Sequence, residues 1–131
     1  MKPNIFIPLI IATLLVAFPN MYCNKSGGSS GDFIPIIENQ WHNINVADDF
    51  FDIGPAAQAN VNSSTFTGTE DSASGTAFYS FSGSFTNHNI QFTYDNNSGA
   101  KSNQTFSGTI NDASTVMTLH NNVFGDLVIE K

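Results

Sequence analysis

From Ser64 to the C-terminus, polar and apolar residues alternate in short segments that are separated by turns rich in Asn, Asp, Gly and Ser. Alternation of this kind places one row of side chains in a core and the other in solvent, as in a β-strand. We expect strands at residues 65–69, 75–85, 90–94, 105–110, 115–119 and 125–130. Because short polar turns and no helical pattern separate them, the sequence predicts an all-β fold with an antiparallel meander. Such a meander forms either a small barrel or a two-sheet sandwich.

The first part of the domain is less regular. Residues 33–37 form an apolar entry segment that a proline keeps extended. Residues 40–46 alternate, and either the face that carries Trp41 or the opposite face with Ile and Val fits a core. Residues 48–55, with the sequence DDFFDIGP, are expected to form a turn or one helical turn that ends at the Gly-Pro pair.

One short phrase, Phe-(Ser/Thr)-Gly-(Ser/Thr), occurs three times. It begins at Phe66, Phe81 and Phe106, and the uneven spacing excludes a solenoid repeat. In a strand, the glycine two positions after each phenylalanine faces the same side as the ring. The phrase therefore predicts that the rings face the core and that the glycines make room for a neighbouring aromatic ring or allow the sheet to bend.

The charge balance excludes one class of partner. The net charge is −7, there is no arginine, and only 11% of the residues are charged. A chain of this kind has no means to neutralise a run of phosphates, so nucleic acid is not an expected partner. Direct attraction to an anionic membrane surface is not expected either, for the same reason.

The N-terminal residues 1–22 have the pattern of an export signal. Lys2 gives a basic start, and the following apolar run over 5–18 is too short to cross a bilayer comfortably, which needs about 20 residues. A buried core helix or a membrane anchor are the alternatives. The chain is therefore expected to divide into a signal peptide (1–22), an attachment cysteine with a flexible tether (23–32) and a single β domain (33–131).

Cys23 is the only cysteine, and a Gly/Ser-rich tract follows it directly. A lone cysteine between an apolar leader and such a tract resembles a bacterial lipoprotein, in particular those of the Bacteroidota. In that family the cysteine becomes the lipid-bearing N-terminus, although Asn20-Met21-Tyr22 stands here where the family has leucine and small residues. The resemblance implies a membrane anchor at Cys23 and a place in the cell envelope, as an outer-membrane lipoprotein. Ordinary secretion is the alternative.

Residues 40–131 resemble the small lipocalin-like β domains of such lipoproteins. The resemblance lies in an early strand that contains tryptophan, followed by strands with the repeated Phe-(Ser/Thr)-Gly-(Ser/Thr) phrase. The Gly-x-Trp signature of lipocalins is absent, because Trp41 follows Asn39-Gln40. The resemblance implies a barrel that binds a small apolar molecule or a partner protein. Most aromatic side chains are expected in the core. The candidates for ligand contact are Trp41, Tyr79 and Tyr94, and the two tyrosines are expected to be partly exposed.

No pattern for catalysis or for a cofactor stands out. His42, His88 and His120 are not spaced as metal ligands, and no nucleophile elbow or phosphate-binding glycine loop occurs. The acidic residues of two turns, which are expected to be solvated, are Asp48, Asp49, Asp52, Glu70 and Asp71. We therefore expect a binding protein without a metal or cofactor, and not an enzyme. The alternatives are a structural or adhesive sandwich that presents a surface to protein or glycan and, more remotely, a small hydrolase that uses acids at a barrel mouth.

Overall fold

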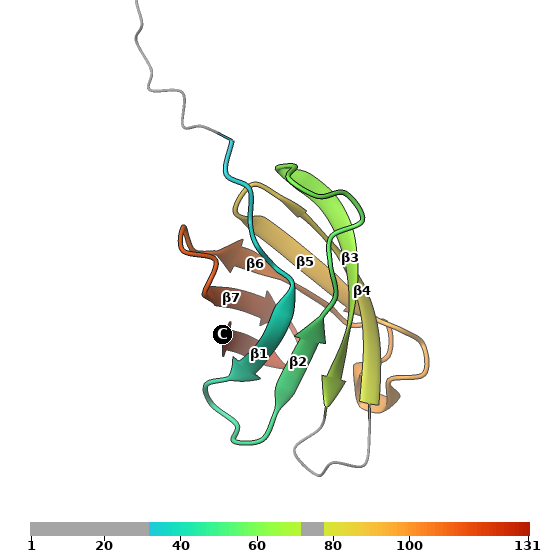
Figure 1. Ribbon diagram of the computed structural model, residues 1–131. Helices are drawn as coiled ribbons and strands as arrows, with labels where there is room; N and C mark the ends of the chain where they lie inside the picture. The colour runs from blue at the N-terminus through green and yellow to red at the C-terminus, as the bar shows by residue number, and fades with distance from the viewer. Residues whose placement is uncertain (1–31, 72–77) are drawn as a thin grey trace, which may run out of the picture.

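The computed structural model of the chain describes residues 32–71 and 78–131. In these residues, eight strands form a closed antiparallel barrel in which each strand pairs with the next and β8 pairs with β1 (Figure 1). The strands are β1 (Asn39–Asn43), β2 (Phe50–Ile53), β3 (Ser63–Asp71), β4 (Phe78–Thr86), β5 (Asn89–Tyr94), β6 (Thr105–Ile110), β7 (Val116–Asn121) and β8 (Gly125–Glu130). A 3-10 turn, η1 (Gly99–Lys101), lies between β5 and β6.

The predicted all-β class is confirmed, and the meander takes the barrel form, not the sandwich. The expected signal at 1–22, the attachment cysteine and nearly all of the tether lie outside the described residues. No helix in the described part of the chain is long and apolar enough to cross a membrane.

The segment 48–55 does not form the expected turn, because its central residues form β2. Phe51 and Ile53 face the core, and β2 pairs with β1 on one side and with β3 on the other. The strand has only four residues, and the aspartates and the Gly-Pro pair around it resemble a turn in the sequence. Pairing on both edges stabilises it in a way that the local sequence does not reveal.

Aromatic side chains pack the middle of the barrel. The ring centroids of Phe81 and Phe92 lie 4.6 Å apart, and Phe92 stacks on Phe106 at 5.6 Å. Trp41 is fully buried, so the tryptophan face of β1 is the core face. The buried apolar side chains are Ile37, Trp41, Phe51, Ile53, Phe66, Phe81, Phe85, Ile90, Phe92, Tyr94, Phe106, Ile110, Met117, Leu119, Leu127 and Ile129.

The three repeated phenylalanines all face the core, as predicted. On β3 and β4 the phrases interlock, because Phe66 pairs with Gly83 and Phe81 pairs with Gly68. A Cβ atom added at either glycine would overlap the ring of the phenylalanine opposite it. The glycines therefore make room for the aromatic rings across the strand pair, as the sequence indicated.

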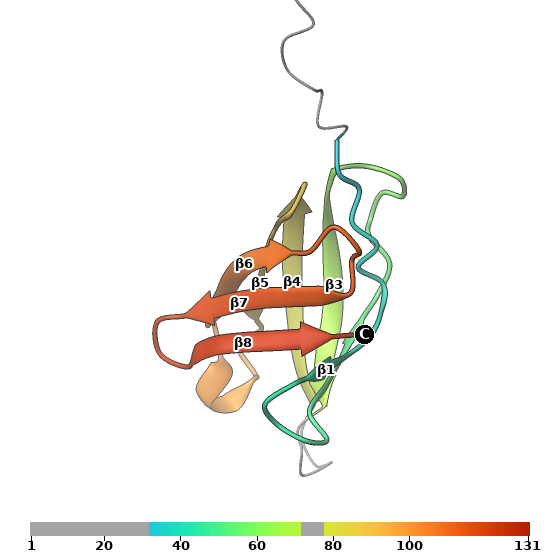
Figure 2. The same ribbon diagram turned by 90° about the vertical axis from the view of Figure 1, so that its left-hand side faces the viewer.

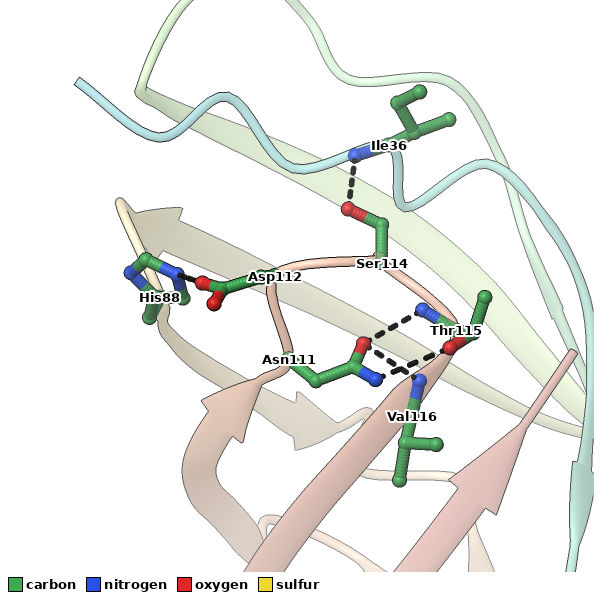
Figure 3. A network of polar contacts seen from close by, with 7 residues as sticks. All are labelled: Ile36, His88, Asn111, Asp112, Ser114, Thr115 and Val116. Atoms are coloured by element: carbon green, nitrogen blue, oxygen red, sulfur yellow. Dashed lines mark hydrogen bonds and ion pairs between the residues drawn. The ribbon is translucent and has the colours of Figure 1, made fainter. Parts of the chain in front are cut away.

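Residues 33–38, here called the strap, cover one end of the barrel before the chain enters β1. Ile37 is part of the core, and its carbonyl oxygen accepts a hydrogen bond of 2.8 Å from Trp41 Nε1. The Ile36 amide donates to Ser114 Oγ at 3.1 Å, which ties the strap to the β6–β7 turn (Figure 3). Lys131 Nζ donates to the Ile36 carbonyl oxygen, so the last residue of the chain is also fixed to the strap.

The β6–β7 turn that receives the strap is itself held by local hydrogen bonds. Asn111 Oδ1 accepts from the amides of Thr115 and Val116 at 2.8 and 3.1 Å (Figure 3). Beside it, His88 Nε2 lies 2.7 Å from Asp112 Oδ1, and the imidazole stacks on Phe33 at 3.8 Å between ring centroids. Both termini of the described domain therefore lie against an ordered turn at this end.

The meander gives the barrel two different ends. Connections alternate between the ends of an antiparallel meander, so the strap, the C-terminus and the β2–β3, β4–β5 and β6–β7 connections share one end, the strap end (Figures 1 and 2). The other end, here called the cavity end, carries the β1–β2, β5–β6 and β7–β8 connections, the end of β3 and the start of β4.

Candidate functional site

A cavity of about 390 Å³ opens at the cavity end of the barrel. This volume lies in the range of small-molecule sites. Its lining combines polar and apolar side chains from strands and from the connections between them: Asn43, Asn45, Val46, Asp49, Glu70, Tyr79, Lys101, Phe106, Phe124, Asp126 and Leu127. The hollows on the outer wall of the barrel are lined mainly by the exposed Ser, Thr and Gln rows and by glycines. The cavity differs from those hollows because it reaches buried ionisable groups.

Glu70, near the end of β3, is the most deeply buried acid of the cavity, with only 2% of its surface exposed. Lys101 Nζ donates to its Oε1 atom, and the hydroxyl of Tyr94 donates to its Oε2 atom. The lysine comes from η1 and the tyrosine from the end of β5. One buried carboxylate thus links three elements, and both of its oxygens have a donor.

The lysine that neutralises Glu70 lies among aromatic rings. Lys101 Nζ is 5.3 Å from the ring centroid of Tyr94 and 5.7 Å from that of Tyr79. The two tyrosine rings meet edge to face, with centroids 6.4 Å apart. These contacts fix the position of the ammonium group and of the wall formed by Tyr79.

Burial controls the protonation of this cluster. Burial raises the pKa of the Glu70 carboxyl, the hydrogen bonds from Lys101 and Tyr94 oppose that rise, and the charge of Asp49 adds to it. Burial likewise raises the pKa of the Tyr94 phenol, and the neighbouring Glu70 carboxylate raises it further. The phenol therefore keeps its proton at neutral pH and acts as a hydrogen-bond donor.

Asp49, which precedes β2, is the second buried acid of the cavity and is 6% exposed. The side-chain Nδ2 of Asn43 donates to Asp49 Oδ2 at 2.8 Å, and the backbone N–H of Asn43 donates to the backbone carbonyl oxygen of Asp49 at 2.9 Å. The other carboxylate oxygen, Oδ1, is buried and makes no hydrogen bond to the described residues. The expectation that the turn acids are solvated is therefore wrong for Asp49 and Glu70.

Exposed apolar side chains surround the cavity end. Phe78 at the start of β4 is 69% exposed, and Phe124 in the β7–β8 turn is 42% exposed. The apolar rim, as we name it, consists of Ile44, Val46, Phe78, Val123 and Phe124. The cavity end therefore combines an apolar entrance with a charged interior.

The three aromatic candidates from the sequence have different positions. Tyr79 is half-buried and lines the cavity. Tyr94 is 1% exposed and lies behind Glu70, so its expected partial exposure is wrong, because it shares the inward face of β5 with Phe92. Trp41 is buried with its indole hydrogen-bonded to the strap and is not among the residues that line the cavity.

The histidines do not join this site. His42 packs against Phe50, His88 contacts Asp112, and His120 Nδ1 lies 2.6 Å from Asp126 Oδ1 on the surface. Within the described ranges, no three His, Cys, Asp or Glu side chains are grouped so that they could hold a metal ion.

Sequence reasoning missed Asp49, Glu70, Asn43 and Lys101 as site residues, although a signal exists for Glu70. Glu70 lies on the same strand face as Phe66, and Asp49 has the same parity as Phe51. Extending the expected strand 65–69 by one position would have placed Glu70 inside the barrel, whereas Asp49 precedes a strand that the local sequence does not reveal. No family model, curated protein or solved structure matches the chain.

Proposed function

We propose that this protein is an exported binding module of the cell envelope, anchored through a lipid at Cys23, whose cavity end binds a small molecule. The observation that carries the binding proposal is the cavity itself. Buried polar groups line it, a packed barrel holds them in place, and an apolar rim surrounds the entrance. Pre-formed, partly apolar cavities with a few fixed polar groups are typical of ligand sites.

The chemistry of the cavity favours binding over hydrolysis. The carboxylate of Glu70 already accepts hydrogen bonds from Lys101 and Tyr94, which hold it in one orientation. None of the three histidines is among the residues that line the cavity. A general acid or base has to reach the reacting atoms, whereas a fixed and neutralised carboxylate is suited to shaping a wall.

The arrangement of the ends supports an orientation for the anchored protein. The described domain begins at the strap end, so a tether from Cys23 would reach the barrel there (Figure 1). The Gly/Ser-rich tether expected up to residue 32 would have a mean span of roughly 16 Å. The cavity end would then face away from the membrane, where a ligand has free access.

Intact mass of the protein from the membrane fraction tests the anchor. We expect the wild type to carry an acyl mass increment on a chain that begins at Cys23, and Cys23→Ser to lose both the increment and the membrane association. A wild-type chain without added mass, or a serine variant that stays in the membrane fraction, would show that the anchor is wrong.

Fragment screening by NMR tests the binding site. We expect small amphiphilic compounds to shift amide signals at the cavity end in a saturable way. Asn45 is an exposed residue of the cavity lining, and the larger side chain of Asn45→Trp would fill the entrance and should abolish those shifts. Gln91→Trp, on the outer wall of β5, should leave the shifts unchanged. Compounds that bind equally well to both variants would exclude the cavity as the site.

A further inference from the structure

The charges of the cavity do not balance in pairs. Glu70 forms an ion pair with Lys101, and Asp126 is exposed at the surface, where its Oδ1 atom lies 2.6 Å from His120 Nδ1. Asp49 has no cationic partner among the described residues, and its only side-chain hydrogen bond comes from the neutral amide of Asn43. Asp49 therefore places a negative charge without a cationic partner in the wall of the cavity.

The Asp49 carboxylate also has an incomplete set of hydrogen bonds. Its Oδ1 atom is buried and accepts none from the described residues, although the side chain lines the cavity. A buried acceptor without a donor is costly, and native proteins rarely leave one unless water, an ion or a ligand completes it. The charge of Asp49 is also felt by its neighbour, because it contributes to the raised pKa of Glu70.

The surfaces beside this carboxylate are apolar. Val46 and Phe124 belong to the apolar rim and line the cavity, and the ring of Tyr79 forms a further part of the wall. An occupant with a charged group alone would leave these side chains in water. One with an apolar body would cover them and gain about 25 cal/mol for each Å² of apolar surface removed from water.

We propose that the cavity binds a small amphiphilic amine, whose ammonium group pairs with the carboxylate of Asp49 and whose apolar body packs against Val46, Tyr79 and Phe124. This inference rests on the proposed binding function and adds the class of ligand. A neutral donor would complete the hydrogen bond but would leave the charge of Asp49 unpaired. An ammonium group supplies both a hydrogen-bond donor and a positive charge. The net charge of −7 on the chain also favours the approach of a cation.

A series of three probes of equal length tests the proposal on the wild-type domain: hexylammonium, hexanol and hexanoate. We expect saturable amide shifts at Asn43, Asp49 and Phe124, with hexylammonium at least about tenfold tighter than hexanol and hexanoate weakest. Asp49→Asn keeps the shape of the side chain and removes its charge, and should weaken hexylammonium about tenfold while leaving hexanol unchanged. Asp112→Asn, at an exposed aspartate of the strap end, is the matched control and should change neither.

The outcomes separate this inference from the proposed function. If hexanol binds the cavity as tightly as hexylammonium, the site binds small molecules but the ammonium preference is wrong. If hexanoate binds best, Lys101 and not Asp49 governs the site, and the inference fails. If none of the probes shifts the cavity end, both the inference and the proposed binding site are contradicted. The comparison of probes on the wild type is decisive even if Asp49→Asn does not fold.

Discussion

Glu70 determines much of the chemistry at the level of single residues. Its burial costs free energy, because a carboxylate loses its hydration in the barrel. The cost is offset only while Lys101 and Tyr94 both donate to it. Removal of one donor therefore has a larger effect than an average surface substitution.

Tyr94→Phe tests this dependence. The substitution keeps the ring in the core and deletes the hydroxyl that donates to Glu70 Oε2. We expect a loss of about 1–3 kcal/mol in the free energy of unfolding, measured by urea denaturation, because a buried carboxylate loses a donor. Tyr79→Phe is the matched control on the other tyrosine of the cavity and should stay within about 0.5 kcal/mol of wild type. Equal effects of the two substitutions would show that the hydrogen bond to Glu70 contributes nothing.

Glu70 also predicts a pH dependence of stability. Since burial raises its pKa above the ordinary value of 4.5, the folded chain holds the proton at pH values where the unfolded chain has lost it. Stability contributed by this group therefore falls as the pH rises from about 4.5 through the raised pKa. We expect the free energy of unfolding of wild type to fall relative to Glu70→Gln over this window, measured by denaturation at a series of pH values. A difference between the two proteins that does not change with pH, or that rises, would contradict the raised pKa.

One acid of the site was predictable from the sequence, and other parts were not. The parity of Glu70 with the core residue Phe66 places it inside the barrel. Asp49 has the parity of Phe51, but β2 is too short to be recognised in the sequence. Lys101 gives no such signal, because it lies in a turn after β5 and reaches Glu70 only when β3, β4 and β5 are side by side. Contacts between residues 31 positions apart depend on the closed sheet and are not visible in local patterns.

Among the elements, β3 and β4 form the most extensive strand pair. Their register runs without interruption from Ser63 opposite Thr86 to Asp71 opposite Phe78. Within it, the rings of Phe66 and Phe81 occupy the space above the glycines opposite them. The pair therefore depends on the absence of side chains at two positions.

Gly83→Ala tests that dependence. The added Cβ would overlap the Phe66 ring and also the carbonyl oxygen of Gln91 on β5, which has little freedom to move. We expect a loss of about 1–3 kcal/mol in the free energy of unfolding by urea denaturation. At Gly54 the nearest atom to an added Cβ is Thr67 O at 3.4 Å, so Gly54→Ala is the control and should change stability by about 0.5 kcal/mol or less. A Gly83→Ala variant as stable as that control would refute the packing role of the glycine.

The sequence indicates most strands because their alternation is strong, and the strands at 105–110 and 125–130 have the predicted bounds. β2 was the exception. Its four residues carry an alternating pattern that is too short to distinguish from a turn, and pairing with β1 and β3 stabilises it. Short strands of this kind depend on their neighbours and not on their own sequence.

At the scale of the whole molecule, closure of the barrel is uneven. β1 and β8 share only the pairs His42–Glu130 and Asn43–Ile129, with one further hydrogen bond of 3.1 Å from the Ile44 amide to Val128 O. The choice between barrel and sandwich depends on this seam, which joins strands from opposite ends of the domain. Alternation within each strand is the same in both architectures, so the sequence left the choice open.

Hydrogen exchange measures the strength of the seam. We expect the Ile44 amide to exchange faster than amides in the centre of β3 and β4, because so short a ladder opens without unfolding the rest of the barrel. The other edge of β8 is an internal control, since β8 pairs with β7 along six residues and should be well protected there. Protection at Ile44 equal to that of the β3–β4 pair would show that the barrel opens only as a whole.

The division of the barrel into a strap end and a cavity end has an optical consequence. From residue 32 onward the sequence contains one tryptophan, Trp41, and two tyrosines, Tyr79 and Tyr94. The indole of Trp41 is hydrogen-bonded to the strap, whereas both phenols lie around Lys101 at the cavity. Tryptophan emission therefore reports movement of the strap, and tyrosine absorbance reports changes near Glu70. The native chain carries a separate intrinsic chromophore for each end, so events at the two ends can be followed in one sample without a label.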